Sequence, residues 1–175
     1  MAIREILQLP NPLLKETSAP VEQFDETLRD FIEDLEETRL NGPAAVGIAA
    51  PQVGHLQRIV IIDCSGTRKP VPNHGRLVLV NPEITEWDGF ALGREGCLSV
   101  PDYTGNVIRA ERVKLHAQDP YGAFHDYEMV GFEARAVQHE VDHLDGVLFV
   151  DRLVSRRTDL FQRKVYQKGG KRKPR

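Results

Sequence analysis

The sequence predicts an α+β domain in which antiparallel or mixed β-sheets pack around a central helix. Two stretches with helical periodicity flank a middle region of short β-branched runs, and this order is typical of the α+β class. The chain has 175 residues, of which 41% are hydrophobic, and this size suits one domain with a single core. We therefore expect one domain over residues 1–155 and a basic C-terminal helix or tail over residues 156–175.

The N-terminal part contains an amphipathic helix and then a tight loop. Leu28, Phe31, Ile32 and Leu35 recur at helical spacing behind Asp25, which is a suitable N-cap. We expect their apolar stripe to face the core. Residues 41–54 (NGPAAVGIAAPQVG) mix Gly, Pro and small apolar residues, and this mixture predicts a tightly folded loop.

The middle and C-terminal parts contain the expected strands and the second helix. Short β-branched runs predict strands over residues 58–63, 76–82, 84–87, 107–116 and 124–130. Residues 131–144 (GFEARAVQHEVDHL) return to helical periodicity, and Gly146 is a suitable stop. Beyond it, Leu160, Phe161 and Val165 have a spacing that would line one further helix.

Composition and charge narrow the class of protein. The chain has no run of about 18 apolar residues, and its start lacks the features of a secretory signal, so we expect a soluble cytoplasmic protein without membrane association. Residues 152–175 carry ten Lys or Arg and one acid, whereas the rest of the chain is acidic. Such a tail attracts polyanions such as RNA. No motif for specific DNA or RNA recognition accompanies it.

The segment HEVDH in the second helix predicts a metal site. His139 and His143 lie one turn apart on one helix face, with Glu140 beside them. This arrangement supplies two metal ligands and a base. A catalytic site usually has three protein ligands and one open position, so a third ligand is needed.

The third ligand has several candidates. No His, Cys or Glu follows His143, and Phe149 stands where a metzincin has its last His, so these two protease patterns fail. A thiolate suits a divalent transition metal alongside imidazoles, which makes Cys97 in EGCLSVP the most attractive candidate. Spacing alone leaves open the other cysteine and the downstream acids, namely Cys64, Asp145, Asp151 and Asp159.

Three separated segments together resemble the signature motifs of peptide deformylases. They are VGIAAPQ (46–52), EGCLSVP (95–101) and QHEVDH (138–143), and the resemblance covers nearly the whole chain but weakens beyond about residue 155. It implies a metal-dependent hydrolase that removes the formyl group from N-formylmethionine at the start of nascent polypeptides and releases formate. It also implies work close to the ribosome, where the basic tail would assist docking.

The resemblance also assigns roles to residues. It places the metal ligands at Cys97, His139 and His143, the catalytic carboxylate at Glu140, and the oxyanion-binding groups at the Gln52 side chain and the Leu98 backbone N–H. It implies one divalent ion, Fe2+ in the cell, with Zn2+, Ni2+ or Co2+ also able to bind. It further implies a methionine pocket, which we assign to Val46, Gly47, Phe132 and Ala136, and a supporting ion pair between Glu95 and Arg109.

Two positions depart from the family pattern, and two other functions compete. Ala45 replaces a glycine of the first motif, and Thr104 stands where some members carry an arginine that contacts the peptide. The first rival function is an HExxH metalloendoprotease. The second is a structural metal site in an RNA-associated module, with His116 or His125 as a fourth ligand.

Overall fold

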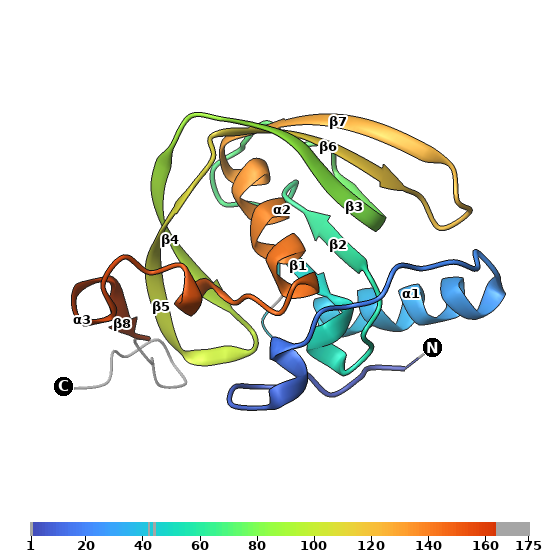
Figure 1. Ribbon diagram of the computed structural model, residues 1–175, viewed down its shortest axis with the longest axis horizontal. Helices are drawn as coiled ribbons and strands as arrows, with labels where there is room; N and C mark the ends of the chain where they lie inside the picture. Colours follow the sequence, from blue (N-terminus) through green and yellow to red (C-terminus); the bar gives the residue numbers. More distant parts are fainter. Residues whose placement is uncertain (1, 42, 44, 164–175) are drawn as a thin grey trace.

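The computed structural model describes residues 2–41, 43 and 45–163. It has a five-stranded and a three-stranded antiparallel sheet, and helix α2 (Gly131–Leu144) runs between them (Figure 1). The mixed α+β architecture that the sequence predicts is confirmed. Among the described residues, no helix is long and apolar enough to span a membrane.

The larger sheet has the strand order β1-β2-β3-β6-β7. Its strands are β1 (Gly47–Ala49), β2 (Ile59–Asp63), β3 (Arg76–Asp88), β6 (Arg112–Gln118) and β7 (Phe124–Val130). Strand β2 is apolar at nearly every position because both of its faces are covered. Val60 and Ile62 pack with residues of α2, whereas Ile59 and Ile61 pack with residues of helix α1 (Glu26–Leu40).

The smaller sheet has the order β4-β5-β8 and lies on the other side of α2 (Figure 1). Its strands are β4 (Ala91–Cys97), β5 (Val100–Arg109) and β8 (Leu160–Gln162). A short turn joins β4 to β5, so that Cys97 pairs with Val100 after a register shift at Gly96. The short helical elements are the 3-10 helices η1 (Pro12–Lys15), η2 (Ala50–Val53) and η3 (Phe149–Asp151) and the one-turn helix α3 (Arg156–Asp159).

The two long helices begin and end where their sequences indicate. The Asp25 side chain accepts a hydrogen bond of 3.0 Å from the Leu28 N–H and caps α1. Helix α2 ends at Leu144, and Gly146 follows in the left-handed region with φ of 74°. Helix α2 buries Ala134, Val137 and Leu144 against the larger sheet, which fixes the direction in which its histidines point.

Several predicted boundaries were wrong. Residues 84–87 continue β3 across its irregularities, and the predicted strand over residues 107–116 is split between β5 and β6. The loop predicted over residues 41–54 contains β1 and η2, and strand β4 was not predicted.

The C-terminal helix is also corrected in part. Leu160 and Phe161 lie in strand β8, which pairs with β5. The spacing of nearby residues could not predict this strand, because its backbone partner is distant in sequence. Val165 and the other tail residues from 164 to 175 lie outside the described residues.

Candidate active site and metal centre

The ligand candidates of α2 and β4 meet at one buried point. His139 and His143 lie on the face of α2 that looks toward β4, and Cys97 ends that strand. The possible ligand atoms of Cys97, His139 and His143 all lie within 4.8 Å of one another, and Cys97 Sγ is 3.4 Å from His143 Nε2. A tetrahedral ion with typical bond lengths separates a sulfur and a nitrogen ligand by about 3.6 Å. The three side chains therefore fit a single metal ion.

The other candidates for a ligand lie apart from this group. Among the described residues, no other cluster of His, Cys, Asp or Glu has metal-binding geometry. Cys64 lies just after β2, and burial raises the pKa of its thiol to about 12. The three downstream acids are engaged elsewhere, since Asp145 pairs with Arg58, Asp151 with Lys15, and Asp159 accepts a hydrogen bond from the Ser155 N–H.

A buried carboxylate holds the ring of His139. Glu95 Oε1 lies 2.8 Å from His139 Nδ1, and Arg109 donates to both Glu95 oxygens at 2.8 and 2.9 Å. Burial alone would raise the pKa of Glu95, but the hydrogen bonds from Arg109 and His139 keep it well below its usual range. Glu95 is therefore ionised and accepts the Nδ1 proton, so Nε2 is the ring nitrogen that is left to serve as a metal ligand.

The electrostatics of the group favour a cation. Burial lowers the pKa of His143 well below its ordinary value, so this ring is neutral, as a metal ligand must be. Burial would also lower the pKa of His139, but its hydrogen bonds to Cys97 and Glu95 raise it well above the ordinary value. Cys97 and Glu95 thus favour one positive charge on or next to the His139 ring, which either a proton or a metal ion at that ring can supply.

Glu140 is buried beside the three ligand candidates. Burial raises the pKa of its carboxyl group to about 7, and its Oε1 has no hydrogen-bond partner among the described residues. Strand β1 approaches it closely at Gly47, because a Cβ built there would stand 2.6 Å from Glu140 Oε2. Only glycine leaves room for the carboxylate in this position.

Gln52 lies on η2 with its amide fixed in orientation. Its Oε1 accepts a hydrogen bond of 2.9 Å from the Ala49 N–H, and its Nε2 donates to Ser99 Oγ at 3.1 Å. The same nitrogen is 3.5 Å from Cys97 Sγ. The NH2 group therefore faces the cleft beside the sulfur, and the carbonyl oxygen faces away.

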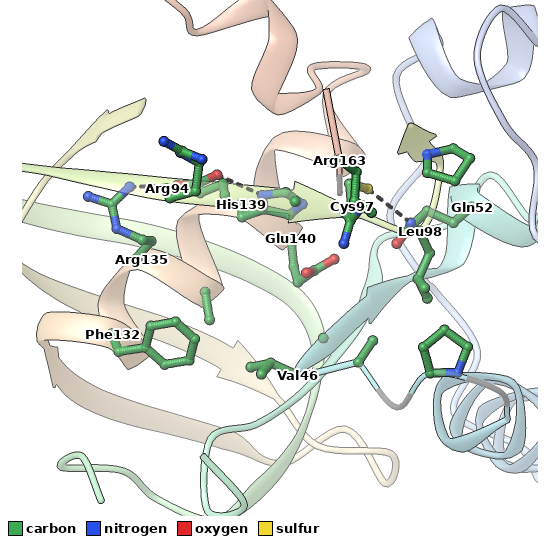
Figure 2. A pocket seen from close by; sticks show the side chains of 17 residues that line it. Val46, Gln52, Arg94, Cys97, Leu98, Phe132, Arg135, His139, Glu140 and Arg163 are labelled. Atoms are coloured by element: carbon green, nitrogen blue, oxygen red, sulfur yellow. Dashed lines mark hydrogen bonds and ion pairs between the residues drawn. The ribbon is translucent and has the colours of Figure 1, made fainter. Parts of the chain in front are cut away.

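These groups line one cleft with a volume of about 560 Å³ (Figure 2). Val46, Phe132 and Ala136 form an apolar part of its wall, Gln52, His139 and Glu140 form a polar part, and Leu98 also lines it. Phe132 is 40% exposed, so it is a wall of the cleft and not a core residue. Ala45 also lines the cleft, whereas Thr104 accepts a hydrogen bond of 3.4 Å from Arg94.

Sequence reasoning missed four residues around the site. Arg135 donates to Glu95 Oε2 at 2.7 Å, and Asp142 accepts from Arg109 at 2.6 Å, so the predicted Glu95–Arg109 pair belongs to a larger buried network. Arg135 lies one helical turn before His139, and this spacing was a signal for it. Ser99, which binds Gln52, stands in the second motif, whereas Arg163 lines the cleft and carries no sequence signal of that role.

Comparison with known proteins identifies the family. Residues 3–159 match the family model described as polypeptide deformylase. A peptide deformylase of Alkalilimnicola ehrlichii is 44% identical over 167 residues, which is 94% of this chain and 90% of that protein. The crystal structure of a peptide deformylase from Legionella pneumophila has a TM-score of 0.79 and 43% identity, and covers 87% of this chain and 86% of that one.

A further solved structure carries a bound peptide. The Met-Ala-Ser-bound crystal structure of class I type b peptide deformylase from Acinetobacter baumannii has a TM-score of 0.81 and 39% identity, and covers 87% of this chain and 99% of that one. A family match over most of the chain, together with relatives at this identity, determines the family of this chain. The chain belongs to the polypeptide deformylase family.

Proposed function

We propose that this protein removes the N-terminal formyl group from formylmethionine of nascent polypeptides by hydrolysis and releases formate. The observation that carries the proposal is the group of Cys97, His139 and His143 beside Glu140 in one cleft. Family membership supports the same reaction, as does the Met-Ala-Ser peptide bound to the Acinetobacter baumannii relative.

Cys97, His139 and His143 hold one divalent metal ion in this proposal. A thiolate and two imidazoles suit Fe2+, and they also suit Zn2+, Ni2+ and Co2+. Such an ion, when bound with one open position, lowers the pKa of a coordinated water from about 16 to about 7. Glu95 orients the His139 ring through its hydrogen bond to Nδ1.

Glu140 is the proton carrier of the reaction. Its Oε1 is buried without a partner among the described residues, which suits an oxygen that accepts a proton from the attacking water. The Gln52 NH2 group and the Leu98 backbone N–H donate to the formyl oxygen as it gains negative charge. Glu140 then gives its proton to the leaving nitrogen when the C–N bond breaks, so the products are formate and a free amine.

The methionine side chain occupies the apolar part of the cleft. Val46, Phe132 and Ala136 surround it, and Gly47, whose missing Cβ leaves room for Glu140, lines the same cleft. The apolar side chain of Phe132 supports this assignment, because the residue is 40% exposed and lines the cleft.

Residues 1–155 form the catalytic domain in this proposal, and the basic residues at the C-terminus assist docking to the ribosome in the cytoplasm. The charge of this tail supports the idea. Deletion of residues 164–175 keeps β8 and tests it: we expect weaker, less salt-dependent ribosome binding in sedimentation. Unchanged binding would remove the docking role.

The two rival functions, a metalloendoprotease and a structural metal site, are tested together with deformylation. His116 pairs with Asp126 and His125 with Asp119 on the β6–β7 hairpin, so neither is placed as a fourth ligand of a closed structural site. The decisive assay combines formate release from formyl-Met-Ala-Ser with casein digestion, using anaerobically prepared protein. We expect formate and intact casein. Casein cleavage without formate would favour an endoprotease.

Substitution of Glu140 separates metal binding from catalysis. Glu140→Ala removes the proton carrier but none of the three ligands, so we expect normal metal content and a loss of formate release of at least roughly a hundredfold. Metal analysis and the formate assay on the same sample measure both. Substantial residual turnover would show that Glu140 does not have this role.

A further inference from the structure

Two arginines at the rim of the cleft have no part in the reaction described above. Arg94 of β4 and Arg163, which follows β8, line the same cleft as His139 and Glu140, and both are exposed (Figure 2). The third arginine of the cleft, Arg135, is neutralised by Glu95. Within the described residues, no carboxylate forms an ion pair with Arg94 or Arg163.

Other side chains fix the guanidinium group of Arg94 in place. It stacks on the ring of Phe161 with its Cζ 3.7 Å from the ring centroid. Its Nε donates to Asn106 Oδ1 at 3.1 Å and its Nη1 to Thr104 Oγ1 at 3.4 Å. An arginine held in this way loses little side-chain entropy when it binds an anion.

Arg163 is held by the pairing of β8 with β5. Gln162 is opposite Tyr103, and the Arg163 backbone N–H donates to the Asp102 carbonyl oxygen at 2.8 Å. The side chain then reaches Gly96, where its Nη2 stands 2.6 Å from the position a Cβ would occupy. Because Gly96 has no side chain, the guanidinium group of Arg163 can occupy the space beside it.

Both arginines lie on or next to the strand that carries Cys97. Arg163 contacts the residue directly before Cys97, and Arg94 lies two positions earlier on the same strand. In the proposed binding mode the methionine lies in the apolar part of this cleft. An extended peptide advances about 3.3 Å per residue, so its next residues remain within reach of a cleft that both arginines line. Planar guanidinium groups bind carboxylates through paired hydrogen bonds.

We propose that Arg94 and Arg163 form a carboxylate-binding subsite that favours formylmethionyl peptides with Asp or Glu at the second or third residue. This inference rests on the proposed deformylation. It deepens that function, because it names the class of substrate that this chain processes fastest. Both arginines are positioned for binding and neither touches the formyl group.

Matched peptide pairs test the subsite. The peptides formyl-Met-Asp-Ser-amide and formyl-Met-Ala-Asp-amide are compared with their Asn counterparts, and the amide removes the competing terminal carboxylate. For the wild type we expect a kcat/KM ratio of acidic over neutral peptide of roughly two to ten, carried by KM and reduced at high salt. In the Arg94→Gln/Arg163→Gln double variant the ratio should fall to about one.

Control variants separate charge from structure. Arg112→Gln removes an exposed arginine outside this cleft, and its ratio should equal that of the wild type. Arg94→Lys/Arg163→Lys keeps the charge and should keep part of the preference, and thermal unfolding shows whether β8 remains in place. A wild-type ratio of one, or a ratio that the double Gln variant leaves unchanged, would overturn the subsite.

Failure of the deformylation itself is distinguishable. If no formylated peptide releases formate, the proposed function has failed. Calorimetric binding of Met-Ala-Asp-amide against Met-Ala-Asn-amide still measures the subsite directly, and equal affinities would overturn it. Tighter binding of the acidic product, lost in the double Gln variant, would support it.

Discussion

Single atoms decide whether the carboxylate of Glu140 can stand where it does. On one side of the carboxylate, Gly47 of β1 has no side chain and so leaves room for it. The buried group of ligand candidates lies on the other side. The position of the carboxylate thus depends on the missing side chain at Gly47 as well as on helix α2, which carries Glu140. A glycine in the first motif therefore has a chemical consequence in the third.

Substitution of Gly47 tests this close approach. In Gly47→Ala the new methyl group would overlap Glu140 Oε2, so the carboxylate must move, and we expect kcat to fall by roughly a hundredfold with metal content unchanged. Gly66→Ala is the matched control, because a Cβ at Gly66 meets nothing within 4 Å. Equal kcat values for the two variants would contradict the positional argument.

The hydrogen bond from His139 to Glu95 makes a second prediction at the residue scale. Glu95→Gln removes the charge that orients His139 and leaves Arg109 with Asp142 as its remaining buried partner. We expect metal affinity to fall by roughly 10- to 100-fold, measured by competition with a chelator. Glu86→Gln, at an exposed pair with Lys114, should leave affinity unchanged, and equal affinities for all three proteins would refute the role.

Two regular periodicities build the site at the scale of the elements. His139 and His143 are four apart on α2, and Glu95 and Cys97 are two apart on β4, so each pair shares one face of its element. The helical pair could be predicted from sequence, because periodicity and motif agree. The resemblance singled out both residues of the strand pair, but their strand could not be predicted, since residues 93–97 (GREGC) have poor β-propensity and depend on pairing with β5.

The end of α2 gives a prediction about stability. Gly146 has φ of 74°, and a Cβ there would overlap the backbone carbonyl of Lys15, whereas Gly75 has φ of 73° with nothing within 4 Å. Gly75→Ala adds only backbone strain, which we expect to cost about 1 kcal/mol. Gly146→Ala adds a collision with backbone atoms and should lower the free energy of unfolding by roughly 2 to 4 kcal/mol. Denaturant titration measures both, and equal losses would contradict the packing.

At the scale of the whole molecule, distant segments are joined around the cleft. The Leu7 N–H donates to the Gln52 carbonyl oxygen at 2.7 Å, and the Leu9 N–H donates to that of Ser99 at 3.0 Å. The N-terminal segment thus ties η2 to the β4–β5 turn, although neither contact has a sequence pattern. Strand β8 likewise joins two segments that are distant in sequence, because it pairs with β5.

The sequence therefore predicted the parts of the molecule that local patterns determine. Capped α1, the apolar β2 and the motif helix α2 each follow from residues close together in the chain. The partner of β8, the split between β5 and β6, and the contact of Arg163 with Gly96 depend on long-range pairing, which periodicity does not encode. The choice of Cys97 over Cys64, by contrast, came from the motif EGCLSVP, and the fold brings Cys97 together with the two histidines.

Diffraction data collected on both sides of the iron absorption edge, from anaerobically prepared crystals, test the central claim most directly. The account predicts one anomalous peak bonded to Cys97 Sγ and to one nitrogen each of His139 and His143, with a non-protein oxygen next to Glu140. A peak away from this trio, or a fourth side chain completing the coordination, would contradict it.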